Sequence, residues 1–417
     1  MIINIKLSAD KHSIVLYFAV LKTGHHSNFF WFRTVKAFLI NLLSRIKKYS
    51  HYLFLIILIL IPSCELFESA SHISADDPGI EYIGRVDLSN PKSVRFDWPG
   101  VQIRTRFEGT SCSMILKDGN NDYNIFIDGR LDKIIRTTDD TIYVIANNLS
   151  DKVHSLLITK RTEAKFGIAA FEGFILDGGK SVLKVKEKKQ RKIEFIGDSF
   201  LAGFGSDGES ADCLFSRETE NCYVSFGPQL ARRLNADYSI VAASGIGVVK
   251  NYGDSLRSSM FPLPYYYDRV CMNDTLLWDY RFWQPDLVVV RLGRNDYWQK
   301  PHPSRETFRT AYINFLKTVR YHYPKAKIFA LCGPIRKEPH CDYIRSAVKE
   351  LSEKIGDKNI RFVKLDISFN QQRDLGCEKH PNRFGHQKIV EFLEPIIRKE
   401  MKWESILKRI LPSNPFN

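Results

Sequence analysis

The stretch EFIGDSFLAGFG, residues 194–205, decides the fold of this 417-residue chain. Its apolar start stops at Gly197, and an acid and a hydroxyl follow at Asp198 and Ser199. Asp and Ser are good helix caps, so this turn could do no more than begin a helix near Phe200. It could also place Ser199 as a nucleophile at the carboxyl end of a buried strand, where open α/β sheets carry out their chemistry. The surrounding sequence decides between these two interpretations.

The sequence from Ile193 onward alternates apolar runs with amphipathic stretches. The expected strands are 193–197, 238–244, 286–293, 327–333 and 360–366, and the expected helices are 222–235, 305–323, 340–356 and 383–402. Nearly continuous apolar strands that alternate with helices are typical of a parallel sheet covered on both faces. We therefore predict an α/β domain over residues 190–403.

A different pattern precedes this domain, from Glu81 to about Val185. Short runs such as SVRFDW and YNIFIDG alternate apolar and polar residues, and Asp-Gly, Asn-Asn and Gly-Gly pairs separate the runs. Period-two alternation with regular turn signals indicates an all-β sandwich or jelly roll, which we place at residues 80–185. The charged stretch 184–192 would link it to the α/β domain.

The amino terminus, residues 1–64, has the pattern of a targeting segment. It holds eight Lys and Arg residues against one acid, which accounts for half of the net charge of +14. The apolar run 52–62 follows a basic stretch, is too short to span a bilayer and is typical of a signal peptide. Cys64 comes next, in a context that resembles the lipobox of bacterial lipoproteins, where the cysteine is lipidated. An ordinary signal peptide or a short membrane anchor is the alternative, and residues 1–44 could reflect an upstream start site.

Nucleic-acid binding is the function that a basic chain first suggests. After residue 64 the lysines lie among acids, as on solvated faces, and the sequence shows no RNP, zinc-finger or basic-helix pattern. We therefore expect no nucleic-acid partner.

Seven cysteines follow Cys64, and export would allow disulfides among them. Cys213 and Cys222, and likewise Cys332 and Cys341, are nine residues apart and could close small loops. Because seven is an odd number, at least one thiol is free or paired elsewhere. No CxxC pair or His-rich cluster has metal-ligand spacing, so we expect neither a metal nor a cofactor.

If the sheet is parallel, the carboxyl ends of its strands meet at one edge. That edge would collect four sequence blocks: GDS (197–199), SGIG (244–247), GRND (293–296) and GCEKHPNRFGH (376–386). This set resembles the SGNH (GDSL-like) hydrolases, which carry a Ser in GDS, a Gly in a second block, an Asn in GxND and a His in a late loop. The resemblance covers residues 193–400 and implies a flavodoxin-like three-layer α/β/α fold.

The resemblance narrows to the family 2 carbohydrate esterases. It rests on WPG and FEG in the β region, on FSRETEN (215–221), on AASGIGVVKNYG and on GCEKHP. Members of that family place a β jelly roll ahead of an SGNH domain and remove acetyl groups from plant polysaccharides. With these motifs the resemblance covers about residues 80–403.

Ester hydrolysis needs a nucleophile, a base for its proton and donors for the developing oxyanion. By the resemblance, Ser199 would be the nucleophile and His380 the base. The oxyanion donors would be the backbone N–H groups of Ser199 and Gly245 and the side-chain amide of Asn295. Gly245 suits this role because an N–H without a neighbouring side chain can approach the substrate closely. The structural alternatives are a helix cap for Ser199 and ordinary loop or turn positions for the other three.

The sequence leaves the third member of a triad open. Many SGNH enzymes carry Asp three residues before the His, but Cys377 holds that position here, and Glu378 lies two residues before the His. Either the Glu378 carboxylate folds back to the imidazole of His380, or a backbone carbonyl orients the ring in a Ser–His dyad. We expect His386 to be structural.

Three residues of the third block and its continuation are candidates for sugar binding. Arg294 departs from the threonine that is usual between Gly and Asn, and is either a solvated charge or a contact for an acidic sugar. Tyr297 and Trp298 would either stack on a sugar ring at a pocket rim or pack into the core.

Together these features predict a surface-anchored bacterial esterase with a jelly roll ahead of an SGNH hydrolase domain. It would remove O-acetyl groups from a xylan- or mannan-type polysaccharide through an acyl-enzyme intermediate. The alternatives are another SGNH hydrolase that acts on lipid or aryl esters, and a carbohydrate-binding lipoprotein that has lost activity. The intact Ser199, Gly245, Asn295 and His380 argue against the second of these.

Overall fold

The computed structural model describes residues 7–10, 13–16, 69–138, 141–334, 339–354 and 356–403. The chain divides into two compact units, 1–67 and 68–417. In the first unit the strands β1 (Leu7–Asp10) and β2 (Ser13–Leu16) pair antiparallel. The predicted leader with its apolar run and Cys64 lies otherwise outside the described residues. Within the described ranges, none of the helices combines the length and the apolar character that crossing a bilayer requires.

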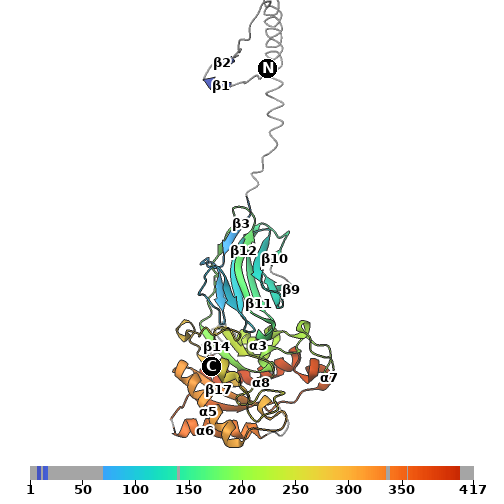
Figure 1. The fold of residues 1–417 in the computed structure, drawn as a ribbon, viewed down its shortest axis with the longest axis vertical. Coiled ribbons are helices and arrows are strands. Elements are labelled where there is room, and N and C mark those ends of the chain that lie inside the picture. The colour runs from blue at the N-terminus through green and yellow to red at the C-terminus, as the bar shows by residue number, and fades with distance from the viewer. Residues whose placement is uncertain are drawn as a thin grey trace, which may run out of the picture. The chain divides into compact units, whose positions relative to one another are not determined.

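The second unit begins with a β sandwich of two antiparallel sheets (Figure 1). One sheet has the order β10 (Thr141–Ala146), β7 (Cys112–Lys117), β12 (Ala169–Leu176) and β3 (Ser71–Ser74), with β5 (Val94–Phe96) also on β12. The other has the order β13 (Val182–Leu183), β6 (Gln102–Gly109), β11 (Lys152–Lys160), β8 (Asp122–Ile127) and β9 (Arg130–Arg136), with β4 (Glu81–Ile83) on β6. Alternate residues along β7 are buried, so the period-two pattern does mark a sandwich core.

A five-stranded parallel sheet follows, with the order β15 (Ala236–Ala242), β14 (Arg191–Gly197), β16 (Leu287–Arg291), β17 (Lys327–Cys332) and β18 (Ile360–Lys364). This is the flavodoxin-like order, and the predicted fold class is confirmed. Every residue of β15 and β16 is buried, because helices cover both faces of the sheet.

The helices divide between the two faces (Figure 1). One apolar core includes residues of α3 (Phe226–Arg233) and α8 (Arg383–Met401), and the other includes residues of α5 (Arg305–His322) and α6 (His340–Lys354). The predicted helix over 222–235 is divided into a 3-10 turn, η3 (Cys222–Val224), and α3, because Ser225 between them has extended backbone angles (φ −67°, ψ 163°).

A buried carboxylate in the middle of β14 connects the sandwich to the parallel sheet. Glu194 receives hydrogen bonds from the hydroxyls of Tyr267 and Tyr323, each at 2.9 Å, and its Oε2 lies 3.4 Å from the Arg85 guanidinium. Arg85 follows β4 and is itself buried. Because an unpaired charge at this depth would be strongly destabilising, the pair fixes the sandwich to the strand that leads to Ser199.

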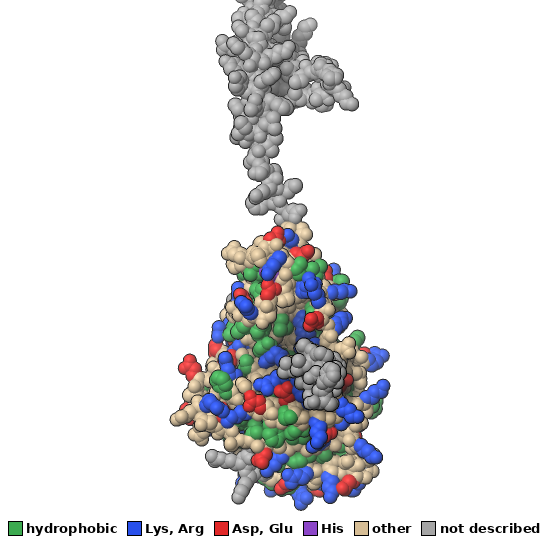
Figure 2. Space-filling model, turned by 180° about the vertical axis from the view of Figure 1, so that it is seen from behind, with side chains coloured by type: hydrophobic (Ala, Val, Ile, Leu, Met, Phe, Trp, Pro, Cys, Tyr) green, Lys and Arg blue, Asp and Glu red, His purple; other side chains and the backbone are tan. Residues whose placement is uncertain are grey.

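Charged side chains of both signs share the visible surface of the second unit (Figure 2). On the face shown in Figure 2, Lys and Arg side chains lie interspersed with Asp and Glu side chains, and they do not gather into one basic patch.

Candidate active site

The GDS turn is formed where β14 ends at the carboxyl edge of the sheet. Asp198 caps the short helix α2 (Ser199–Ala202), since its Oδ1 accepts a hydrogen bond from Phe200 N at 3.1 Å. The same oxygen lies 2.5 Å from a guanidinium nitrogen of Arg291, at the end of β16, and both side chains are buried. Asp198 therefore organises the turn, and Ser199 is left at its tip with 9% of its surface exposed.

His380 reaches Ser199 from a loop nearly two hundred residues later in the chain. It lies between η6 (Cys377–Lys379) and α8, and its Nε2 is 2.9 Å from Ser199 Oγ. Its Nδ1 is 3.1 Å from the backbone carbonyl oxygen of Glu378. A neutral imidazole with Nδ1–H donating to that carbonyl directs the Nε2 lone pair at the Ser199 hydroxyl, which is the arrangement of a nucleophile and its base.

Burial sets the protonation state of His380. Removal from water lowers the pKa of the imidazole to about 4, although the hydrogen bond with the Glu378 carbonyl opposes the shift. The imidazole is thus neutral at pH 7 and able to accept a proton.

The carboxylate of Glu378 does not contact the imidazole. Its Oε1 accepts a hydrogen bond from Phe215 N at 3.1 Å, and the residue has a positive φ of 51° that turns its carbonyl toward the ring. Of the two arrangements that the sequence leaves open, the structure has the backbone carbonyl, so Glu378 as the carboxylate member of a triad is corrected. His386 is fully buried in α8 and packs against Phe226.

The predicted oxyanion donors Gly245 and Asn295 lie in the loops after β15 and β16, the two strands that flank β14 in the sheet. Gly245 follows β15 with φ 77°, a conformation that favours glycine, and Asn295 begins the 3-10 turn η5 (Asn295–Tyr297) after β16. The Asn295 amide donates one hydrogen bond to Ile246 O at 2.8 Å, which leaves its second N–H for another acceptor. Among the described residues, the N–H groups of Ser199 and Gly245 have no hydrogen-bond acceptor.

Asp296 holds the loops of Gly245 and Asn295 together. Its buried carboxylate accepts hydrogen bonds from three successive N–H groups, at 3.0 Å from Val248, 2.7 Å from Val249 and 2.9 Å from Lys250. Burial raises the pKa of Asp296 to about 6, while the backbone hydrogen bonds lower it. Sequence reasoning did not assign a role to Asp296, although its place after Asn295 in GRND was the available signal.

Two neighbouring aromatic residues, Trp298 and Tyr252, form the rim of the site beside Gly245. Trp298 is 48% exposed, the Arg294 guanidinium carbon lies 4.7 Å from its ring centroid, and the ring of Tyr252 lies 6.0 Å away. Tyr252 was missed by sequence reasoning, and its N–H donates to Gly245 O at 2.7 Å. Of the two positions expected for Tyr297, rim or core, the structure has the core: the ring is buried against Phe308, because the side chains of Tyr297 and of Trp298 after η5 point in different directions.

Two pockets differ in their relation to this site. One of about 570 Å³ adjoins the oxyanion loop and is lined by Ser244, Gly245, Tyr252, Leu256, Met260 and Phe261 among others. A larger one of about 680 Å³ is lined by residues of the 78–89 and 276–283 segments, and none of the candidate catalytic residues borders it.

The disulfides confirm one sequence-based pair and correct the other. Cys332 and Cys341 are bonded, whereas Cys213 pairs with Cys377 and not with Cys222. Cys222 is buried in η3, where its Sγ faces Leu201 O at 3.4 Å.

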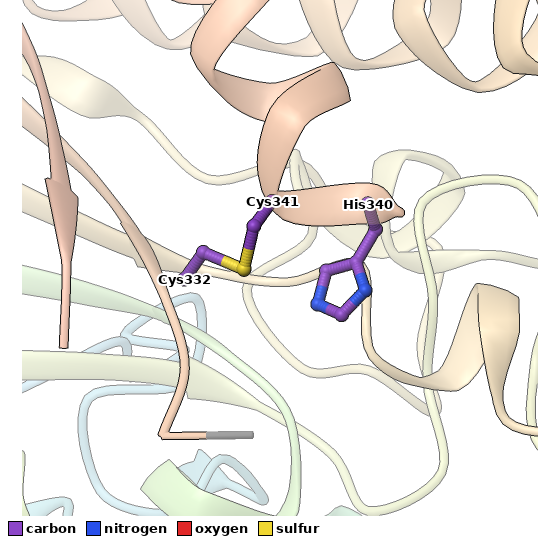
Figure 3. Close-up of side chains that lie close together, drawn as sticks. All are labelled: Cys332, His340 and Cys341. Atoms are coloured by element: carbon purple, nitrogen blue, oxygen red, sulfur yellow. A yellow bond between two sulfur atoms is a disulfide. The ribbon is translucent and has the colours of Figure 1, made fainter. Parts of the chain in front are cut away.

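The Cys332–Cys341 disulfide lies beside a histidine (Figure 3). The donor atoms of Cys332, His340 and Cys341 lie within 4.8 Å of one another, as a metal site would require. Both sulfurs belong to the disulfide, so they do not present the thiolates that a metal ion binds.

The fold and the Ser–His pair define a hydrolase of the GDSL-like class. Residues 195–388 match the model of the GDSL-like lipase/acylhydrolase family, and residues 82–185 match that of the carbohydrate esterase 2 N-terminal domain. The similarity to individual proteins agrees with both matches. The chain belongs to carbohydrate esterase family 2.

The chain is 34% identical over 342 residues to the cellulase/esterase CelE of Acetivibrio thermocellus. This match spans 79% of the chain but only 40% of the length of that relative. The chain is 28% identical over 321 residues to an acetylxylan esterase/glucomannan deacetylase of Cellvibrio japonicus, which covers 73% of this chain and 85% of the relative. Among solved structures, a family two carbohydrate esterase from Clostridium thermocellum in complex with cellohexaose matches with a TM-score of 0.73 and 31% identity, over 78% of this chain and 100% of the other.

The low pKa of His380 predicts the pH dependence of ester hydrolysis. Because burial disfavours the imidazolium, the free enzyme should keep its neutral base down to about pH 4 and lose kcat/KM only as the pH falls through that value. The measurement is kcat/KM for a soluble acetyl ester between pH 3 and pH 8, with enzyme first shown to regain full activity after exposure to each pH. A midpoint at the ordinary histidine value of about 6.5 would contradict the burial of the ring.

Proposed function

We propose that this protein removes O-acetyl groups from a polysaccharide through an acyl-enzyme intermediate on Ser199. The observation that carries the proposal is the 2.9 Å contact between Ser199 Oγ and His380 Nε2, with Nδ1 held by the Glu378 carbonyl. The donors for the oxyanion are the backbone N–H groups of Ser199 and Gly245 and the side-chain amide of Asn295. One N–H of that amide already donates to Ile246 O, so the other serves the oxyanion.

The geometry supports two displacement steps. His380 Nε2 accepts the proton of the Ser199 hydroxyl as Oγ bonds to the acetyl carbon, and the oxyanion forms facing Gly245 N–H and the Asn295 amide. The imidazolium then protonates the sugar oxygen, and the bond between that oxygen and the acetyl carbon breaks. In the second step His380 Nε2 takes a proton from a water molecule as its oxygen bonds to the acetyl carbon of the acetyl-serine. The bond from that carbon to Ser199 Oγ then breaks, acetate leaves, and the imidazolium returns the proton to Oγ.

A dyad changes the electrostatics of this cycle. A carboxylate beside Nδ1 would stabilise the imidazolium by a full charge, whereas the Glu378 carbonyl offers only a dipole. The carbonyl still selects the tautomer, because it can accept a hydrogen bond from Nδ1–H but cannot donate one.

The substrate that fits the rim is an acetylated plant polysaccharide of the xylan or mannan type. Exposed Trp298 and Tyr252 offer faces on which sugar rings can stack, and Arg294 beside Trp298 could contact an acidic sugar in the chain. Relatives with 28% and 25% identity are named acetylxylan esterase/glucomannan deacetylase, which supports the same class of substrate.

One observation favours an ester with a larger apolar acyl group as the second candidate. The pocket beside Gly245 includes the exposed side chains of Leu256 (70%), Met260 (81%) and Phe261 (41%). These would suit a lipid or aryl ester, and activity that rises with acyl length would favour that alternative.

Replacing either member of the Ser–His pair tests the proposed chemistry. Ser199→Ala and His380→Ala should each abolish turnover of a small acetyl ester while the thermal unfolding midpoint stays near that of the parent protein. The double variant should be little worse than either single one, because the two side chains act as one unit. Near-full activity in Ser199→Ala would overturn the proposal.

Replacing Trp298 tests the class of substrate. Trp298→Ala should lower acetate release from acetylated xylan or mannan much more than hydrolysis of p-nitrophenyl acetate, because only the polymer uses binding energy from sugars outside the acetyl pocket. Tyr321→Ala is a matched control, since Tyr321 is an exposed aromatic residue (82%) on α5. Equal losses on both substrates would assign Trp298 to support of the catalytic loop.

We also propose, on the strength of the sequence pattern alone, that the protein is exported and becomes a bacterial cell-surface or periplasmic lipoprotein through lipidation of Cys64. Each buried CH₂ group contributes about 0.8 kcal/mol, so loss of several acyl chains would be decisive. Cys64→Ser should therefore move the protein from the membrane fraction to the soluble fraction, as judged by immunoblotting of fractionated cells. Unchanged membrane association would point to an uncleaved 52–63 anchor or to a bound partner.

A further inference from the structure

We propose that the 205–216 segment positions the catalytic histidine, with Glu378 and the Cys213–Cys377 disulfide as the connecting groups. The proposal rests on the function argued above, in which His380 is the base. It assigns to the Glu378 side chain a positioning role through Phe215, in place of a direct role on the imidazole.

Three successive N–H groups ahead of His380 donate into this segment. Cys377 N donates to Gly205 O at 3.2 Å, Glu378 N to Cys213 O at 3.0 Å, and Lys379 N to Ala211 O at 3.0 Å. The disulfide joins the same two segments covalently, and its cysteines are 164 positions apart in the sequence. The whole turn before His380 is therefore held by a segment that is distant in sequence.

The Glu378 side chain adds a return contact. Its Oε1 accepts the Phe215 N–H at 3.1 Å, so Glu378 is bonded to the segment through both its backbone and its carboxylate. The ring of Phe215 stacks on that of Phe204, with the ring centroids 4.0 Å apart. The centroid of the Phe204 ring lies 4.4 Å from that of the His380 ring. The segment thus contacts the turn on one side and, through Phe204, the imidazole itself on the other.

The turn needs such support because of its backbone conformation. Glu378 (φ 51°) and Lys379 (φ 58°) are consecutive non-glycine residues in the left-handed region, which persists only where surrounding contacts hold it. That conformation directs the Glu378 carbonyl at Nδ1 of His380. In a dyad this carbonyl is the group that orients the ring, so release of the turn would misalign Nε2 and Ser199.

The close fit of the disulfide supports the same conclusion. A Cβ added at Gly208 would collide with the sulfurs of both Cys377 and Cys213, so the segment can approach the turn only with glycine at this position. Trp298 and Tyr252 at the rim belong to other loops. Loss of the segment's contacts should therefore impair the chemical step and leave substrate binding intact.

The test compares variants at Glu378 that differ only in the hydrogen bond to Phe215. Glu378→Ala removes the acceptor and should lower kcat for a small acetyl ester by about 10- to 100-fold, the usual scale for misplacing a catalytic group, with KM changed less than twofold. Glu378→Gln keeps a side-chain oxygen for Phe215 N–H and should recover most of that loss. If the carboxylate acted directly on the imidazole, Glu378→Gln would lose as much kcat as Glu378→Ala, because both variants lack the charge.

A disulfide pair of variants supplies the matched control. Cys213→Ala/Cys377→Ala should lower kcat with little change in KM, whereas Cys332→Ala/Cys341→Ala, which removes the other disulfide, should keep kcat within about twofold. If the first double variant does not unfold cooperatively, the Glu378 variants alone decide the matter.

The outcomes separate this proposal from the proposed function. Equal losses in Glu378→Ala and Glu378→Gln, equal losses in the two disulfide variants, or an effect confined to KM would each overturn the positioning role. If Ser199→Ala is inactive while Glu378→Ala keeps its kcat, the positioning role fails and the proposed function stands. If Ser199→Ala stays active, the proposed function itself fails.

Discussion

The active-site edge depends on the buried ion pair between Arg291 and Asp198. Arg291 ends β16, and its guanidinium lies 2.5 Å from Asp198 Oδ1, just after β14. Its Nε donates to the carbonyl of Gly333, just after β17, at 3.2 Å. Its guanidinium carbon lies 3.6 Å from the centroid of the Phe200 ring. One guanidinium thus joins the carboxyl ends of three strands. Burying two charges costs a large desolvation energy that only good geometry offsets, and loss of one partner would cost about 3–5 kcal/mol. The pair therefore fixes the turn from which Ser199 projects.

The remaining parts of the site are loops that this fixed edge brings together. Asp296 connects the Gly245 and Asn295 loops through three backbone hydrogen bonds, and the 205–216 segment holds the turn before His380. Both sets of contacts use backbone N–H or carbonyl groups, and neither places a charged side chain at the imidazole of His380. This explains how the site can work as a dyad: the orientation that a triad carboxylate supplies comes here from a carbonyl held in an unfavourable conformation.

The features that the sequence predicted are those set by local pattern. Continuous apolar runs located all five parallel strands to within about two residues, and the parallel topology then placed Ser199, Gly245, Asn295 and His380 at one edge. The features it missed depend on contacts between distant segments. The sequence around Cys213 does not show that this residue lies against Cys377. The sequence around Glu378 does not show that this non-glycine residue adopts a positive φ. Tyr297 and Trp298 are adjacent and chemically alike, and only tertiary packing makes one core and the other rim.

In a dyad, Ser199 is a nucleophile that His380 alone among the ionisable side chains activates. Mass spectrometry after reaction with a fluorophosphonate, a reagent that modifies activated serines, tests it most directly. We expect one adduct per chain, mapped to Ser199, formed in the parent protein and in Glu378→Gln but not in His380→Ala under the same conditions. An adduct on a different serine, or full modification of Ser199 in His380→Ala, would contradict it.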